Sequence, residues 1–186
     1  MLIIVEGPDC SGKTTFVKYL TEYIVSNTSA RVIGLRARPP KPGSDSFKEY
    51  VQPLMGYRPT DPFHVICDRW HLGERIYPKV LGRDTDMNRD VFDEVEKFLE
   101  LLGAIIVRPY VGTYTLKKRI IERGDDLITP QMLGSIAYGY NCVFRQTRLP
   151  VMTYDPLTIN LTLFMQHVVD EAIKRQEAMR DNSHTR

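Results

Sequence analysis

Short apolar runs alternate with longer amphipathic segments along this chain, and that alternation is typical of a parallel sheet covered by helices. We expect strands at Leu2–Val5, Ala30–Leu35, Phe63–Cys67, Ala104–Val107 and Val151–Tyr154. The pattern therefore predicts an α/β fold with a five-stranded parallel sheet and helices on both faces.

Helices are predicted from apolar spacing and from residues that start or stop helices. Between Asn88 and Leu102 apolar positions recur at helical spacing, and Gly103 follows as a stop. Further helices are expected at Lys13–Asn27, at Thr113–Arg123, from the N-cap pair Thr129-Pro130, and over the apolar stripe Leu157, Leu161, Phe164, Met165, Val168 and Ala172. The prolines between Arg36 and Gly43 exclude helix and central strand there.

The chain has 186 residues, a length that suits one well-buried domain. We predict a single domain over residues 1–178 and a flexible polar tail over residues 179–186. The 25 basic and 23 acidic residues are interspersed, so the charge pattern favours neither nucleic acid nor a membrane as partner. A homodimer is left open.

The cysteines are Cys10, Cys67 and Cys142, which are odd in number, far apart and without metal-ligand spacing. Such cysteines indicate reduced thiols. Because no apolar run reaches membrane-spanning length and the chain begins with a core strand, we expect a cytoplasmic protein, in a bacterium or in a virus-infected host cell.

A glycine loop follows the first predicted strand. Residues 7–15 fit the pattern G-x-x-x-x-G-K-[ST], in which glycines let backbone N–H groups turn toward a polyphosphate. The following helix would present its positive end to the same anion. We expect ATP to be bound by Gly7, Pro8, Asp9, Cys10, Ser11, Gly12, Lys13, Thr14 and Thr15, with Lys13 on the β/γ-phosphates and Thr14 on Mg²⁺.

Polar residues also follow the other strands, at the sheet edge where ligands bind in parallel α/β folds. Asp68 ends the third strand and is our second candidate ligand for Mg²⁺, although it could instead cap the segment that begins at Trp70. Arg69 offers a fork of donors suited to phosphate oxygens, although it could instead form an ordinary ion pair; the first role is preferred because the residue follows a strand. Arg36 and Arg38 follow the second strand.

The chain resembles the thymidylate kinase and deoxynucleoside kinase branch of the P-loop kinases as far as about Tyr154. The resemblance rests on Glu6–Asp9 with Gly12–Thr15, on Asp68-Arg69-Trp70, and on Arg119 and Arg123 ahead of Gly124-Asp125. It implies a three-layer P-loop kinase fold with a short basic lid. It also implies that Asp9 contacts the acceptor nucleotide, that Arg69 holds the acceptor phosphate, and that Arg119 and Arg123 close on the ATP phosphates.

One stretch departs from this family, because the sequence Leu35-Arg-Ala-Arg-Pro-Pro-Lys-Pro42 contains no acid. A hydroxyl acceptor needs a base to remove its proton, whereas an acceptor that already bears a phosphate needs cations. Arg36 and Arg38 therefore favour a monophosphate acceptor. Glu74 and Asp9 remain alternative acids, and the His-Leu-Gly-Glu stretch before Arg75 differs from the serine-rich continuation of cellular thymidylate kinases. A viral or divergent relative that acts on a modified pyrimidine, or on a base within DNA, stays open.

Aromatic residues could frame a base, and Trp70 is the favoured one because it adjoins Arg69. For Phe47, Tyr50, Tyr77, Tyr138 and Tyr140 core packing is the more frequent role. The expected acceptor site comprises Asp9, Arg36, Arg38, Arg69, Trp70 and Glu74, and the expected catalytic set comprises Lys13, Asp68, Arg69, Arg119 and Arg123.

The sequence thus predicts a kinase that moves the γ-phosphoryl of ATP to a pyrimidine deoxynucleoside monophosphate with Mg²⁺. One alternative is a kinase of a hydroxyl, on a nucleoside or on a hydroxymethylated base in DNA. Another is a nucleotide-binding module or regulatory NTPase. The base, the sugar, the phosphate donor and the oligomeric state are not predicted.

Overall fold

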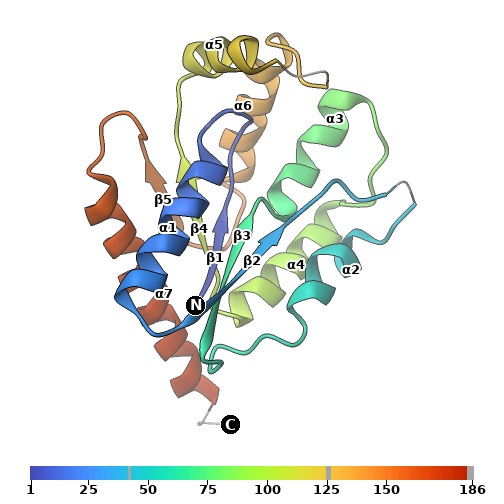
Figure 1. The fold of residues 1–186 in the computed structure, drawn as a ribbon. Coiled ribbons are helices and arrows are strands. Elements are labelled where there is room, and N and C mark those ends of the chain that lie inside the picture. Colours follow the sequence, from blue (N-terminus) through green and yellow to red (C-terminus); the bar gives the residue numbers. More distant parts are fainter. Residues whose placement is uncertain (42, 125–126, 184–186) are drawn as a thin grey trace.

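A five-stranded parallel sheet forms the centre of the protein, in a computed structural model that describes residues 1–41, 43–124 and 127–183 (Figure 1). The strand order is β2-β3-β1-β4-β5, and every neighbouring pair runs parallel. The strands are β1 (Leu2–Val5), β2 (Arg31–Arg36), β3 (Phe63–Asp68), β4 (Ile105–Pro109) and β5 (Val151–Tyr154). The predicted fold class is confirmed.

Helices cover both faces of this sheet, because alternate residues of the buried strands point to opposite sides. Ile3 and Val5 pack with Phe16 and Val168 on one face. Leu2 and Ile4 belong to the core on the other face, which also contains Phe92, Leu116 and Leu133. The longer helices are α1 (Lys13–Asn27), α4 (Arg89–Leu101), α5 (Thr113–Arg123), α6 (Met132–Val143) and α7 (Leu161–Ser183). The α5 helix lies over the loop that joins β1 to α1 (Figure 1).

Short helices occupy segments for which the sequence predicted none. They are α2 (Ser46–Val51), η1 (Gln52–Leu54), η2 (His71–Arg75) and α3 (Tyr77–Leu81). Two of them follow β3 directly, so the chain folds back over the carboxyl end of the sheet after Asp68. In the described part of the chain, no helix combines the length and the apolar character needed to cross a membrane.

Two predicted helix starts were wrong. Thr129 does not cap α6; its carbonyl accepts a 3.1 Å hydrogen bond from the Met132 N–H, so Pro130 sits in a turn before the helix. Leu157 lies outside α7, in a turn where its N–H donates a hydrogen bond to the Asp155 carboxylate. Its side chain is 63% exposed. The α7 helix continues through Ser183, into the segment expected to be a flexible tail, and residues 184–186 of that tail lie outside the described ranges.

Candidate active site

The glycine loop after β1 closes around the Lys13 side chain. Gly12 has a φ of 95°, a left-handed conformation that glycine adopts without strain, and its carbonyl accepts the Phe16 N–H at 2.9 Å to begin α1. The Lys13 ammonium donates a 2.5 Å hydrogen bond to the Pro8 carbonyl. The loop therefore has the shape that wraps an anion, with its one ammonium turned inward.

Lys13 is buried, and burial together with the neighbouring Arg69 lowers its pKa to about 7. An ammonium in such a place is poorly stabilised by the protein alone. A phosphate bound in the loop would supply the missing negative charge and favour the protonated amine.

Thr14 and Asp68 form a pair at the edge of this loop. The Thr14 hydroxyl donates a 2.8 Å hydrogen bond to Asp68 Oδ2, and the Arg36 guanidinium lies 3.8 Å from the same oxygen. The other oxygen, Asp68 Oδ1, is buried without a hydrogen-bond partner in the described structure. The alternative role as a helix cap is wrong, since Trp70 is the N-cap residue of η2 and no side chain caps that helix.

This pair fits a magnesium ion. Hydroxyl and carboxylate oxygens are ligands that Mg²⁺ accepts, and the ion usually takes its remaining ligands from phosphates and water. No group of three or more acidic, histidine or cysteine side chains suitable for a metal occurs among the described residues.

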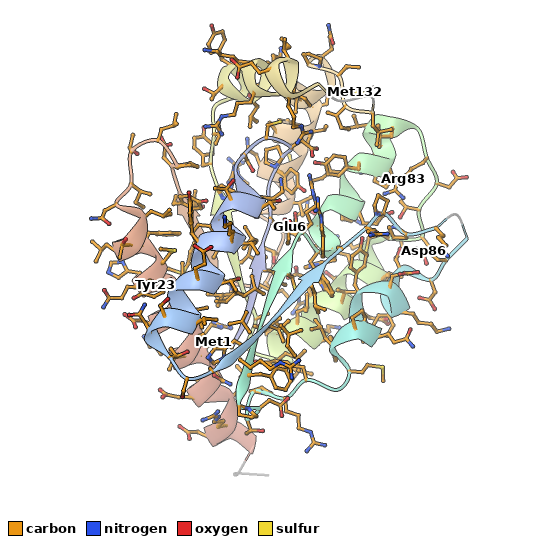
Figure 2. The ribbon with its side chains drawn as sticks, viewed as in Figure 1. Met1, Glu6, Tyr23, Arg83, Asp86 and Met132 are labelled. Carbon is orange, nitrogen blue, oxygen red and sulfur yellow. The ribbon has the colours of Figure 1, made fainter. Side chains whose placement is uncertain are left out.

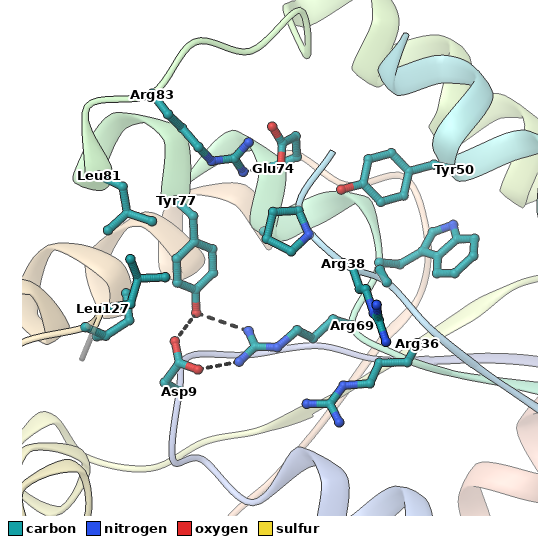
Figure 3. Close-up of a pocket in the computed structure, with 15 residues that line it drawn as sticks. Asp9, Arg36, Arg38, Tyr50, Arg69, Glu74, Tyr77, Leu81, Arg83 and Leu127 are labelled. Carbon is teal, nitrogen blue, oxygen red and sulfur yellow. Dashed lines mark hydrogen bonds and ion pairs between the residues drawn. The ribbon is translucent and has the colours of Figure 1, made fainter. Parts of the chain in front are cut away.

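Asp9, Arg69 and Tyr77 form a second cluster beside the loop. Arg69 makes an ion pair with Asp9 and donates a 3.1 Å hydrogen bond to the Tyr77 hydroxyl, which donates to Asp9 at 2.6 Å (Figure 3). Burial alone would raise the pKa of Asp9, but the cations Arg69 and Lys13 and the Tyr77 hydrogen bond outweigh it and hold that pKa below its ordinary value. Asp9 is therefore a stable carboxylate.

The backbone at Arg69 is unusual. Its φ is 67°, in the left-handed region that few residues other than glycine adopt. Hydrogen bonds on either side hold this turn: the Arg69 N–H donates to the Val5 carbonyl at 3.0 Å, and the Trp70 N–H donates to Glu6 Oε1 at 2.6 Å. Because the backbone is fixed, the Arg69 side chain is aimed across the end of β1.

Glu6 is a fully buried carboxylate in the interior of the molecule, just after β1 (Figure 2). It joins distant parts of the chain. Besides the Trp70 N–H, it accepts a 2.9 Å hydrogen bond from the Tyr140 hydroxyl of α6. Both of its oxygens are thus occupied, which is what a buried carboxylate requires.

A groove of about 550 Å³ runs along the glycine loop under α5. The Arg119 guanidinium donates a 3.0 Å hydrogen bond to the Cys10 carbonyl, which places the predicted lid directly over the loop. The groove is lined by Asp9, Cys10, Gly12, Lys13, Thr14, Thr15, Arg36, Arg69, Arg119 and Arg123. Gly7, Pro8 and Ser11, which are also expected to bind ATP, are buried and do not line the groove, so their expected contacts would come from the backbone.

A cavity of about 380 Å³ adjoins this groove (Figure 3). All residues of the expected acceptor site, Asp9, Arg36, Arg38, Arg69, Trp70 and Glu74, line it. The groove and the cavity share Asp9, Arg36 and Arg69. Pro42 of the acid-free stretch and Asp125 of the lid motif lie outside the described residues.

Comparison with solved structures identifies the fold. The YorR protein of Bacillus subtilis, solved in complex with phosphorylated GDP, has a TM-score of 0.72 at 21% identity, over 91% of this chain and 94% of that chain. A polyphosphate kinase 2 from Arthrobacter aurescens TC1 has a TM-score of 0.64 at 16% identity, over 97% of this chain and 68% of that chain. A deoxyadenosine kinase from M. mycoides, solved with dCMP and dCDP, has a TM-score of 0.51 at 17% identity, over 92% and 98%.

The protein has the P-loop kinase fold. No family model matches the sequence, and no curated protein does. The structure brings together the glycine loop, Asp68 at the end of β3 and the basic helix α5, which the sequence had placed near one another.

The aromatic candidates divide into those that line the cavity and those that do not. Tyr50 and Tyr77, for which core packing was the more frequent role, line the cavity together with Trp70, whereas Tyr140 is buried and Tyr138 is 71% exposed. The other cavity residues that sequence reasoning missed are Ala37, Pro39, Gly73, Leu81, Arg83, Leu127 and Ile128. The only sign in the sequence that these residues belong to the cavity is that they lie near Arg38, Glu74 or the lid.

Proposed function

We propose that this protein is an ATP-dependent kinase that transfers the γ-phosphoryl group to a pyrimidine deoxynucleoside monophosphate. The observation that carries the proposal is the junction of two cavities at Asp9, Arg36 and Arg69. One cavity follows the phosphate loop and the other lies beyond it. A phosphoryl group that leaves a nucleotide in the groove would enter the adjoining cavity between two arginines.

The donor side would act by positioning and by charge. Lys13 and the backbone of the loop would hold the β- and γ-phosphates. Thr14 and Asp68 would hold Mg²⁺, which when bound neutralises charge that develops on the phosphates. Arg119 and Arg123 would cover the groove and limit access of water to the transferred group, which favours a transferase over an NTPase.

The acceptor side would bind an anion. An oxygen of the acceptor phosphate forms the new bond to the γ-phosphorus while the bond to the bridging oxygen of ADP breaks, so no proton has to be removed. Arg69, Arg36 and Arg38 supply positive charge for that phosphate. The two carboxylates that could act as a general base already form ion pairs, Asp9 with Arg69 and Glu74 with Arg83.

The ligands of two structural neighbours are consistent with a nucleotide acceptor. YorR was solved with phosphorylated GDP, and the deoxyadenosine kinase with dCMP and dCDP. The polyphosphate kinase 2 neighbour makes polyphosphate the alternative donor to compare with ATP.

The deciding experiment incubates the protein with Mg²⁺ and either ATP or polyphosphate, together with thymidine, dTMP, dCMP, dUMP, dGMP or hydroxymethylated DNA. Products are separated by chromatography. We expect a pyrimidine deoxynucleoside diphosphate and ADP in equal amounts. Lys13→Ala should reduce kcat at least about a hundredfold, the scale for loss of one preorganised donor.

Other products would contradict the proposal. If thymidine or hydroxymethylated DNA were the better acceptor, the protein would be a hydroxyl kinase, and Asp9 and Glu74 would be the bases to replace. If ATP were hydrolysed without any phosphorylated acceptor, the protein would be an NTPase.

A further inference from the structure

An ion pair closes the end of the acceptor cavity that lies away from the phosphate loop (Figure 3). Arg83 donates a 2.5 Å hydrogen bond to Glu74 Oε2, and Glu74 is only 3% exposed. Within the described structure, Glu74 Oε1 and Arg83 Nε are both buried without a hydrogen-bond partner. The pair therefore has one unused acceptor and one unused donor, an arrangement that buried polar groups normally avoid.

The Tyr50 hydroxyl adds a second hydrogen-bond donor at the same end of the cavity, so that Arg83, Glu74 and Tyr50 together form its end wall. Tyr50 lines the cavity, and its hydroxyl points toward Glu74 in Figure 3. Within the described structure, no hydrogen bond joins this hydroxyl to another residue. Burial and the nearby Glu74 carboxylate raise the pKa of Tyr50, so the hydroxyl stays protonated and can donate.

The helix that carries Tyr50 is held in place at its first turn. Asp45 caps α2 by accepting the Lys48 N–H at 3.1 Å, and Asp86 accepts the Ser46 N–H at 3.0 Å. The Tyr50 ring packs edge-on against Trp70, with 5.8 Å between ring centres. Tyr50 is thus positioned before any ligand binds.

On the basis of the proposed function, we propose that Arg83, Glu74 and Tyr50 select the acceptor base by pairing with its edge. The wall presents a donor, a carboxylate acceptor and a donor. Uracil and thymine present the complementary row, with the N3–H between the O4 and O2 carbonyls. The Glu74 carboxylate would have to rotate to bring an oxygen to the N3–H, since Oε1 is buried and Oε2 accepts from Arg83 in the structure.

The other bases fit this wall less well. Cytosine places the lone pair of N3 where Glu74 needs a donor, and adenine offers only one acceptor on that edge. Guanine pairs its O6 and N1–H but sets its amino group against a donor. Arg69 and Arg36, which would bind the phosphate, lie toward the other end of the cavity, so a nucleotide that spans it brings its base to Glu74.

The experiment measures binding by calorimetry without ATP, and turnover separately with ATP. The ligands are dTMP, dCMP and the analogue of dTMP methylated at N3. For the wild-type protein we expect dTMP to bind at least about thirtyfold more tightly than either of the others, since a site built to pair with a polar group rejects a ligand that lacks it.

Glu74→Gln provides the specificity test. Its amide can turn an N–H toward the N3 lone pair of cytosine, so the preference for dTMP over dCMP should fall to about threefold or less. Glu49→Gln is the matched control, because Glu49 is an exposed carboxylate on the helix of Tyr50 and should leave the preference unchanged.

Equal binding of the three ligands to the wild-type protein, or no binding of dTMP, would overturn the inference without any variant. An unchanged dTMP preference in Glu74→Gln would also overturn it. Selective binding of dTMP without phosphoryl transfer would instead refute the proposed kinase function and leave the base selection standing.

Discussion

The Thr14 hydroxyl donates a 2.8 Å hydrogen bond to the Asp68 carboxylate, which joins the first turn of α1 to the carboxyl end of β3. These residues are 54 positions apart in the sequence. The contact places two side-chain oxygens beside the glycine loop and leaves Asp68 Oδ1 without a partner among the described residues.

Asp68→Asn should therefore impair magnesium use more than folding. The amide is nearly isosteric and can still accept the Thr14 hydroxyl, but it lacks the charge that favours Mg²⁺. We expect the Mg²⁺ concentration for half-maximal turnover to rise at least about tenfold, with a small change in Tm. A magnesium titration of kcat alongside thermal unfolding checks this. An unchanged titration with a clear loss of Tm would show a structural role only.

Lys13 should make the stability of the nucleotide-free protein depend on pH. Its pKa falls from 10.5 to about 7 on folding, so between these values the unfolded chain binds more protons than the folded one. The free energy of unfolding should therefore rise with pH in that window. For this group alone we expect a gain of about 2 kcal/mol between about pH 7 and about pH 9.

Urea denaturation at a series of pH values measures this effect. Lys13→Met, which retains the aliphatic length without the charge, should be more stable than the wild-type protein near neutral pH and should lose the rise. Equal slopes for the two proteins would refute the assignment.

Arg69 should determine the preference for a phosphorylated acceptor. The wild-type protein should prefer dTMP over thymidine by at least about a hundredfold in kcat/KM, the scale of a charge-assisted contact. Arg69→Ala should remove most of this preference by slowing the reaction of dTMP. Because the Arg69 backbone has a φ of 67°, Arg69→Gly serves as an unstrained second variant that should behave alike.

Arg31→Ala is the matched control for these variants. Arg31 is an exposed arginine at the opposite end of the sheet, at the start of β2. If it altered the preference as strongly as Arg69→Ala, general charge rather than the Arg69 contact would be responsible.

Glu96 should support stability far from the loop. This buried carboxylate accepts hydrogen bonds from the Thr147 hydroxyl at 2.7 Å and the Arg148 N–H at 2.7 Å, and it lies 2.6 Å from His71 Nε2. Burial opposes its ionisation, but these partners prevail and lower its pKa below 4.5. The stability that Glu96 contributes is therefore fully present above pH 4.5, and it is lost as the pH falls through the lowered pKa of Glu96.

Glu96→Ala should cost about 3 kcal/mol of unfolding free energy at neutral pH, because it leaves buried donors without partners. The exposed Glu94 of the same helix provides the control, and Glu94→Ala should change stability little. Urea denaturation of both variants measures the difference, and similar values would contradict the assigned role of the buried network.

The parts of the fold that the sequence predicted are those with local signals. The glycine loop, the strands and the α4 helix depend on neighbouring residues: Asn88 accepts the Val91 N–H at 3.0 Å, and Gly103 follows the helix with a φ of 69°. Short helices such as α2 and α3 give too few turns for a periodic pattern. They were therefore missed.

The residues of the acceptor cavity could also be predicted only where the sequence carries a local signal. Arg69 and Trp70 were found because they follow a strand, whereas Arg83 and Tyr50 reach the cavity only through the way α2 and α3 pack. Tyr77 was considered as an aromatic residue, but its hydroxyl donates a hydrogen bond to Asp9, which lies 68 positions away in the sequence. Such contacts depend on tertiary structure, and no regular spacing of residues in the sequence indicates them.

The carboxylate of Glu6 has a consequence for the order in which the chain folds. Its partners are Trp70, 64 positions away, and the Tyr140 hydroxyl, 134 positions away. Closing loops of that length is entropically costly, so such contacts tend to form late. During synthesis, a nascent chain that ends before α6 cannot give Glu6 its second partner. Glu6 should therefore gain its full set of partners only after most of the protein has left the ribosome.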